Sequence, residues 1–401
     1  MEKREFIKRS VLGVGGLLLS DKIFAANNHS EEFSELAKHK IGKTELVTLD
    51  YQWPRFVGKN GARDVHGQYN KASILKIHTD QGAMGWGISH PGAAKELSVL
   101  EGRSVAELVT PDKGLANGLN PFYFDLPLFD LLGVIMNKPV YEILGAKGKK
   151  QNPVYSGMIY LDEIPYKEFK GGLDTIMDNC AWDYNYGYRQ FKIKIGRGKN
   201  WYPAKEGMKM DVKVVKMIYE EYKDKGVDIL VDANNSYSLD DTITFLKGVQ
   251  DIPIYWVEEP FPEAMETGKK LRTWMDGNGF AHTRYADGEW IGPDDPNDIA
   301  LKMARTGILN TYLNDIHAIG ITNWKKIMPK LKKAGATASP HTWGDRLKTH
   351  YATHLAAGCG NIPTIEGVTC LSDDIDYGDY PIRNGKIEVS DKPGFGMKLL
   401  K

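Results

Sequence analysis

Residues 189–195 read RQFKIKI, and the alternation within these seven residues indicates the architecture of the chain. Lys192 and Lys194 are two positions apart, so they share one face of a strand, while the phenylalanine and isoleucines around them share the other. The apolar face must pack against a layer of helices, which turns both lysines inward. An exposed edge strand with one charged face is the alternative, but a closed barrel has no edge strands. The segment therefore predicts one strand of a helix-covered barrel.

Similar short apolar segments recur after residue 150, and amphipathic helical patterns lie between most of them. This alternation is typical of an α/β fold, a (β/α)8 TIM-like barrel, which we predict for residues 151–371. A doubly wound parallel sheet is the structural alternative, but no GxGxxG motif follows the first strand. The predicted strands are PVYSGMI (153–159), RQFKIKI (189–195), VDILVDA (227–233), IYWVEE (254–259), TRYADGE (283–289), TYLNDI (311–316), ATASPH (336–341) and IPTIEG (362–367).

The region before the barrel predicts a smaller α+β domain. Strand-like segments at 43–51 and 71–79 flank a stretch from 52 to 70 that is rich in glycine and charge, which we expect to be a mobile loop. Helical patterns follow at about 95–108 and 122–145.

We therefore predict an N-terminal α+β capping domain over residues 41–150. The tail from 372 to 401 no longer alternates between strand and helix patterns, and we expect it to return to the capping domain.

The first residues differ from the rest. Residues 1–10 are cationic, residues 11–19 (VLGVGGLLL) are apolar, and small residues follow at 23–26. This layout predicts an export signal over residues 1–26, and hence a periplasmic protein. Lys3-Arg4 resembles a twin-arginine signal with lysine in the first position. A frayed N-terminus is the alternative.

Composition excludes several classes of function. The chain has 401 residues, of which 42% are hydrophobic and 26% charged, and its formal net charge is zero. A neutral chain is a poor partner for nucleic acid or an anionic membrane surface. Three cysteines exclude a disulfide scaffold. No apolar run is long enough for a transmembrane helix.

Polar residues stand at the ends of seven predicted strands, at separations of 25 to 38 residues. A barrel has about 31 residues per βα unit, so each separation is close to one unit. The side chains should therefore lie at one height at the carboxyl ends of the strands, where barrel active sites lie. They are Lys192 and Lys194, Asp232, Glu258, Glu289, Asp315, His341 and Glu366.

Asp232, Glu258 and Glu289 predict a metal site. Each alone could be a solvated loop carboxylate. On consecutive strand ends they converge, and three carboxylates repel one another unless a cation binds. Oxygen ligands with open positions favour Mg²⁺, with Mn²⁺ possible. Glu259 follows Glu258, but the pleat sends neighbours to opposite sides, so only one of them can be a ligand.

The remaining polar residues suggest acid–base chemistry. A lysine acts as a base when its pKa falls, and a neighbouring lysine and a nearby cation both act in that direction on Lys194. His341 alone could be a core histidine, but Asp315 could hold one ring nitrogen and leave the other as a base. Glu366 could equally be a structural acid.

With these motifs the chain resembles the enolase superfamily, specifically the mandelate racemase subgroup, over nearly all residues after about 41. The Lys-x-Lys motif, the three carboxylates and the Asp315–His341 pair match that family, as do the helical segment 124–145 and the tail Pro393–Gly396. The family implies abstraction of the proton α to a Mg²⁺-bound carboxylate. Lys194 would be a base on one face, and His341 the base or acid on the other. Lys192 and Glu366 would contact the substrate carboxylate.

The expected reaction is the dehydration of a sugar acid to its 2-keto-3-deoxy product. The alternatives are a racemase or epimerase of a 2-hydroxy acid, and an exported sugar-acid binding protein without turnover. We also expect a homo-oligomer. Two departures from the family are the export signal and a long basic stretch, 197–209, which could reshape one wall of the site. Predicted substrate contacts are Asn234 (or support of a metal ligand), Arg55, Arg63, His66 and Trp343, with Asp64 in the same loop.

Overall fold

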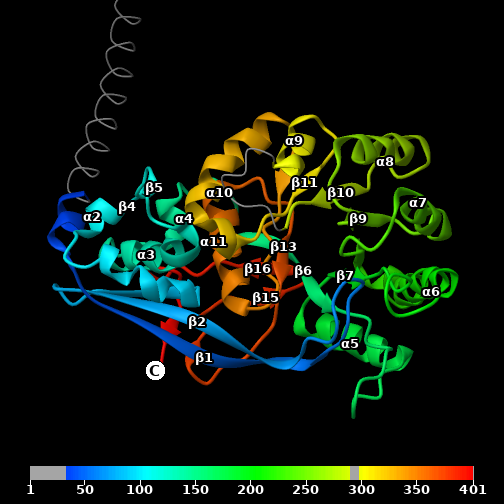
Figure 1. The fold of residues 1–401 in the computed structure, drawn as a ribbon, viewed down its shortest axis with the longest axis horizontal. Helices are drawn as coiled ribbons and strands as arrows, with labels where there is room; N and C mark the ends of the chain where they lie inside the picture. Colours follow the sequence, from blue (N-terminus) through cyan, green and yellow to red (C-terminus); the bar gives the residue numbers. More distant parts are fainter. Residues whose placement is uncertain (1–32, 290–297, 401) are drawn as a thin grey trace, which may run out of the picture.

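The computed structural model describes residues 33–289 and 298–400, and the predicted export signal lies outside them. Figure 1 shows the two parts of the molecule, with a cap built from the N-terminal elements on one side and a larger barrel on the other. No helix in these residues combines the length and the apolar character that crossing a membrane requires.

The predicted barrel is confirmed. Eight strands, β6 to β13, run parallel to their neighbours, and β13 pairs with β6 to bring the ends together. The segments of β12 and β13 are joined by hydrogen bonds that include the Ala338 amide donating to the Asn361 carbonyl and Ser339 Oγ donating to the Thr364 carbonyl. The strands are β6 (Gln151–Ile159), β7 (Gln190–Lys194), β8 (Asp228–Asp232), β9 (Ile254–Glu258), β10 (Arg284–Asp287), β11 (Thr311–Tyr312), β12 (Thr337–Ala338) and β13 (Ile365–Gly367).

A helix follows each of the first seven barrel strands, whereas the eighth βα unit departs from the expected pattern. Residues 368–400, all of them described, contain short strands and no helix after β13. The chain turns back toward the cap instead. The barrel helices are α5 (Leu173–Tyr186), α6 (Ala204–Tyr222), α7 (Leu239–Gly248), α8 (Met265–Gly277), α9 (Ile299–Arg305), α10 (Ile316–Lys333) and α11 (Arg346–Cys359).

Aromatic and aliphatic side chains fill the barrel interior below the polar strand ends. The Tyr155 and Trp256 rings meet edge to face with centroids 5.1 Å apart. Leu230, Ala286 and Leu313 join them in one buried cluster. This packed layer is the floor of the site, below the polar groups at the carboxyl ends of the strands.

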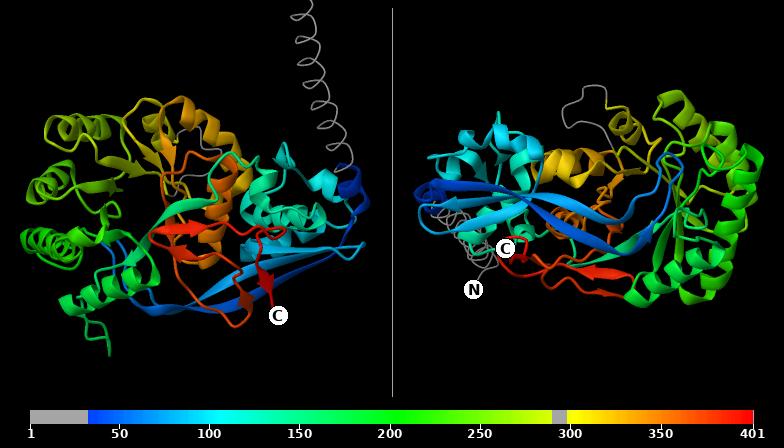
Figure 2. Two further views of the ribbon diagram at one scale, coloured as in Figure 1. Left: turned by 180° about the vertical axis from the view of Figure 1, so that it is seen from behind. Right: turned by 60° about the horizontal axis from the view of Figure 1, so that its bottom comes forward.

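The cap contains an antiparallel sheet whose hairpin is longer than the sequence predicted. The expected loop over 52–70 is wrong at both ends, because β1 continues to Val57 and β2 begins at Gly67, which leaves 58–66 as the connection. Figure 2 shows this hairpin running from the cap to the barrel. The strands are β1 (Ile41–Val57), β2 (Gly67–Thr79) and β3 (Met84–Ser89).

The cap helices are shorter than predicted. The expected helix over 95–108 is broken by Gly102, whose φ is 69°, and the chain restarts at Ser104, which forms a capping box with Glu107. Asn137, with φ of 51°, and Pro139 likewise divide the second predicted helix. The helical segments are η1 (Pro91–Lys95), η2 (Leu97–Val99), α2 (Val105–Leu108), α3 (Pro121–Ile135) and α4 (Val140–Ile143).

The C-terminal segment contacts both parts of the molecule. Leu371 forms a β-bridge with Gln52 of β1, and Gly394 forms one with Pro139 beside α4. The buried Asp130 of α3 accepts hydrogen bonds from the amides of Trp86 (3.0 Å) and Phe395 (2.8 Å). One carboxylate thus joins a cap strand, a cap helix and the tail. In Figure 1 the C-terminus lies beside the cap.

Replacing Asp130 with alanine should destabilise the fold, because two buried amides lose their acceptor. Each unsatisfied group costs about 1–3 kcal/mol. Urea unfolding followed by circular dichroism measures the effect. The control is Asp376→Ala in the same tail, where the exposed carboxylate accepts one amide hydrogen bond, from Gly378. It should change stability by less than about 0.5 kcal/mol. Equal losses in both variants would contradict the role of Asp130.

Candidate active site

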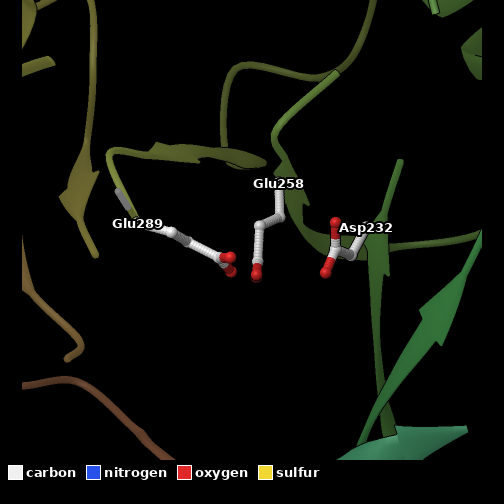
Figure 3. A group of neighbouring side chains, drawn as sticks. All are labelled: Asp232, Glu258 and Glu289. Carbon is white, nitrogen blue, oxygen red and sulfur yellow. The ribbon is translucent and has the colours of Figure 1, made fainter. Parts of the chain in front are cut away.

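Three carboxylates converge at the carboxyl ends of consecutive strands. Asp232 ends β8 and Glu258 ends β9, and the two residues are direct partners in the parallel ladder. Glu289 lies two residues beyond β10. One oxygen from each side chain lies within 4.8 Å of the others. Figure 3 shows all three side chains directed into the same space, with Glu258 in the middle of the row.

The carboxylates are almost completely buried, and this makes their charges costly. Burial raises the pKa of Glu258 and that of Glu289 well above the usual value. Burial acts in the same direction on Asp232, but Lys194 and Lys192 outweigh it and lower the pKa of Asp232 to about 2. Glu258 Oε2 and Glu289 Oε1 have no hydrogen-bond partner among the described residues. Buried oxygens of this kind fit a divalent cation.

Two lysines of β7 supply positive charge on the same side of the row. Lys194 is ion-paired with Asp232. Lys192 lies one pleat deeper, with its Nζ 2.5 Å from Glu258 Oε1 and 2.9 Å from Glu366 Oε1. Although burial disfavours its charged form, Glu258 and Glu366 raise the pKa of Lys192 well above its usual value. Both lysines thus point into the barrel, as the alternation of β7 predicted.

His341 lies at the other end of the carboxylate row, beside Glu289. Asp315 and His341 form a parallel bridge just beyond β11 and β12, so their side chains are neighbours. His341 Nδ1 lies 2.8 Å from Asp315 Oδ2, and its Nε2 lies 3.5 Å from Glu289 Oε2. The ring is therefore held by one nitrogen and directed to the metal-site carboxylates by the other.

Glu366 and Asn234 support this arrangement. Glu366 Oε2 accepts a hydrogen bond of 2.6 Å from the Thr342 amide, next to His341. A Cβ on Gly157 would come within 2.7 Å of Glu366 Oε1, so a glycine is needed there. The backbone amide of Asn234 donates to Asp232 Oδ1 at 2.9 Å. Asn234 therefore orients a metal-site carboxylate through its backbone.

The loop from 58 to 66, which we call the hairpin loop, is docked on the barrel and is not the free loop that the sequence suggested. Its Gly58 amide donates to Asp162 Oδ1 at 2.8 Å, after β6. Trp201 Nε1 and Asn200 Nδ2 donate to carbonyls of the loop at 2.6 and 2.9 Å. Both donors lie in the basic stretch 197–209, which therefore supports the hairpin loop.

Four aromatic rings connect the hairpin loop to the site. The Lys194 ammonium lies 5.3 Å from the Tyr160 ring centroid. Tyr160 in turn contacts His66 and Trp343, with ring centroids 4.9 and 4.8 Å away. Trp343 stacks on Trp53 of β1. His66 and Trp343, both predicted to contact substrate, thus lie one ring away from Lys194.

Two predicted substrate contacts do not lie in this group. Arg55 donates both ends of its guanidinium to Asp183 of α5, at 2.7 and 2.8 Å, and one of them also to the Met158 carbonyl. We therefore correct its role to fastening β1 to the barrel. Arg63 is exposed at the tip of the hairpin loop. Its side chain, like that of the exposed Asp64, is outside the buried site.

Sequence reasoning missed Tyr160 and Lys348. Tyr160 directly follows the first predicted strand, so its position at a strand end was a usable signal. Lys348 lies 2.8 Å from Asp315 Oδ2 through its Nζ. It sits on α11, and no pattern in the sequence shows toward which strand that helix turn faces.

The parallel strands bring proton-transfer groups and a cluster of carboxylates suited to a metal ion to one end of the barrel. This arrangement defines the class of protein as an α/β-barrel enzyme. The family model of enolase C-terminal domain-like proteins matches residues 177–401, more than half of the chain, and the chain belongs to this family. A mandelate racemase/muconate lactonizing protein from Geobacillus sp. Y412MC10, complexed with magnesium/tartrate, has a TM-score of 0.82 and 29% identity, over 90% of this chain and 93% of that one. The resemblance seen in the sequence is confirmed.

Three further relatives are named after reactions. Galacturonate dehydratase from Geobacillus sp., complexed with D-galacturonate and 5-keto-4-deoxy-D-galacturonate, has a TM-score of 0.83 and 29% identity, over 90% of this chain and 95% of that one. Arabinonate dehydratase of Saccharolobus solfataricus is 26% identical over 69% of this chain and 68% of its own length. An L-Lys-D/L-Arg epimerase of Methylococcus capsulatus is 24% identical over 81% of this chain and 90% of its own.

Glu258 belongs to the carboxylate cluster and the adjacent Glu259 does not, and a binding experiment can test the distinction. Glu258→Gln should lower the affinity for Mg²⁺ about tenfold or more in isothermal titration calorimetry, because a buried anionic ligand is lost. Glu259→Gln is the matched control and should bind Mg²⁺ nearly as the unmodified protein does. Circular dichroism checks that both variants fold. The reverse order of affinities would overturn the assignment.

Proposed function

We propose that this protein is a Mg²⁺-dependent hydro-lyase that dehydrates a sugar acid to a 2-keto-3-deoxy acid. One observation carries the proposal. The buried carboxylate row has Lys194 at its Asp232 end and His341 at its Glu289 end. Two proton-transfer groups thus flank the place where a substrate carboxylate would bind, which suits removal of a proton from one side and delivery of a proton from the other.

Asp232, Glu258 and Glu289 would hold the cation, Mg²⁺ in preference and Mn²⁺ as the alternative. Their two unpartnered oxygens and their mutual proximity fit such an ion. When bound, the cation would neutralise the substrate carboxylate and stabilise the negative charge that develops on it after the α-proton leaves. Magnesium in the related Geobacillus structures supports this choice.

The chain's own residues would perform the proton transfers. Lys192 Nζ would donate to the substrate carboxylate, and Glu366, whose Oε1 lies 2.9 Å from that Nζ on the inner side of the row, would hold the ammonium in place. Lys194 or His341, according to the configuration at C2, would take the C2 proton. The electron pair of the broken C–H bond forms the C2–C3 double bond and expels the C3 hydroxyl. That hydroxyl takes up one proton and leaves as water.

The resulting enol has a hydroxyl at C2 and tautomerises to the ketone by gaining a proton at C3. The proton taken from C2 and the one lost from the enol hydroxyl balance those given to the leaving water and to C3, so no oxidant or reductant is required. His341 is suited to serve the leaving group, because Asp315 fixes its Nδ1 and leaves Nε2 directed into the site.

Sugar acids are the favoured substrates. The related proteins named above include galacturonate and arabinonate dehydratases. The match to the galacturonate dehydratase covers 90% of this chain. The rings of Tyr160, Trp343 and His66 enclose the Lys194 side of the site with both apolar faces and polar edges. Such a wall can pack against C–H groups and contact hydroxyls of a polyhydroxylated chain.

Epimerisation of a 2-hydroxy acid is the second candidate. The L-Lys-D/L-Arg epimerase relative supports it, as does the presence of a base at each end of the carboxylate row. The two reactions share the first step and diverge when the C3 hydroxyl leaves. A panel of aldonic, aldaric and uronic acids, assayed for 2-keto acid formation, separates them. Solvent deuterium at C2 without keto-acid release would favour epimerisation.

The two bases can be separated by substitution, because each faces one side of the substrate. We expect Lys194→Ala and His341→Asn each to lower dehydration by about 10²–10⁴-fold. His341→Asn should retain exchange of the α-proton that Lys194 reaches, and Lys194→Ala should retain the exchange that His341 catalyses. ¹H NMR in D₂O with a confirmed substrate measures both. Unchanged turnover in both variants would contradict the assignment of Lys194 and His341 as the two bases.

A further inference from the structure

Asp315, which orients the histidine, is held by four donors, and one of them is a lysine outside the barrel strands. Its Oδ1 accepts the amides of His317 and Ala318, at 2.8 and 3.0 Å, because Asp315 is the N-cap of α10. Its Oδ2 accepts from His341 Nδ1 and from Lys348 Nζ, both at 2.8 Å. Lys348 and His341 therefore share one oxygen atom.

Lys348 also reaches the loop that carries the histidine. Its Nζ lies 3.3 Å from the Trp343 carbonyl, two residues after His341. The lysine is placed in the first turn of α11, whose N-cap Asp345 is buried and accepts the Leu347 amide at 2.8 Å. One ammonium group thus connects the start of α11, the end of β11 and the segment after β12.

This contact differs from an ordinary surface ion pair. The Lys348 side chain is 16% exposed and that of Asp315 only 4%. Burial favours a neutral carboxyl, but Lys348 and His341 hold the pKa of Asp315 well below its usual range. In a site screened from water the Coulomb attraction within such a pair is stronger than it is at the surface.

We propose that Lys348 is a positioning residue for His341, acting by fixing the shared Asp315 oxygen and the Trp343 carbonyl so that Nε2 stays directed at the carboxylate row. The inference rests on the proposed role of His341 in proton transfer. Without Lys348, Asp315 would keep its two amide donors and remain in place. Its Oδ2 and the 341–343 segment would lose their common anchor, so the ring would hold its orientation for less of the time.

Two substitutions separate the charge of Lys348 from the length of its side chain. Lys348→Met keeps the length and the apolar stem but removes the ammonium group, whereas Lys348→Arg keeps the charge and a donor. Lys332→Met is the matched control, since Lys332 is an exposed lysine in the last turn of the neighbouring α10. Urea unfolding of the three variants shows whether any loss is one of folding.

The decisive experiment places Lys348→Met in two backgrounds and follows α-proton exchange by ¹H NMR in D₂O. In Lys194→Ala, where exchange depends on His341, adding Lys348→Met should lower the rate about 10–100-fold. In His341→Asn, where exchange depends on Lys194, it should leave the rate unchanged. In the otherwise unmodified enzyme kcat should fall by a similar factor with little change in KM. Lys348→Arg should recover part of this loss, and Lys332→Met should show none.

A spectroscopic measurement separates this inference from the proposed function. The His341 Nδ1 proton shared with Asp315 should give a downfield ¹H resonance in water, assigned by its absence in His341→Asn. Lys348→Met should shift or broaden it. If that occurs in a protein that exchanges no α-proton of any sugar acid, the proposed function fails and the positioning stands. An unchanged resonance with unchanged exchange in Lys194→Ala, or equal loss in both backgrounds, would overturn the positioning role.

Discussion

The burial of three carboxylates at one end of a closed barrel is the constraint on which the site depends. Two unit charges about 4 Å apart repel by about 4 kcal/mol at an effective dielectric constant of 20. Oxygens of Asp232, Glu258 and Glu289 all lie within 4.8 Å of one another, so ionising all three is costly. The strand register makes Asp232 and Glu258 direct neighbours, and Glu289 follows the next strand. Lysines from β7 must therefore enter the barrel beside them, where positive charge offsets part of the cost.

The same constraint explains why the barrel interior is not polar throughout. A layer that includes Tyr155 and Trp256 separates the charged strand ends from the opposite end of the barrel. Asp232, Glu258 and Glu289 are at most 3% exposed. The electrostatic interactions of the lysines and the histidine are thereby kept in a medium of low dielectric constant, where they direct proton transfer more strongly than they would in water.

The cap hairpin is attached to the rest of the molecule at two points in the last part of β1. Arg55 fastens β1 to α5, and Leu371 of the returning tail pairs with Gln52. The tail follows β13 in the chain, where a regular barrel would have its eighth helix. The tail thus joins the barrel to the cap in place of a regular eighth βα unit. Asp130 holds the tail near its C-terminal end by accepting the Phe395 amide.

The amino-acid sequence by itself determined the barrel and the main polar residues at the carboxyl ends of its strands. Side chains on a strand alternate in direction, and parallel strands of a barrel end together, so the spacing of Asp232, Glu258 and Glu289 was enough to bring them to one place. The tertiary structure alone decided which other polar residues belong to that place. Arg55 was predicted at the site and is tied to Asp183, whereas Lys348 was overlooked and contacts Asp315. The physical reason is that loop directions and helix rotation depend on packing between distant segments, which no local period in the sequence encodes.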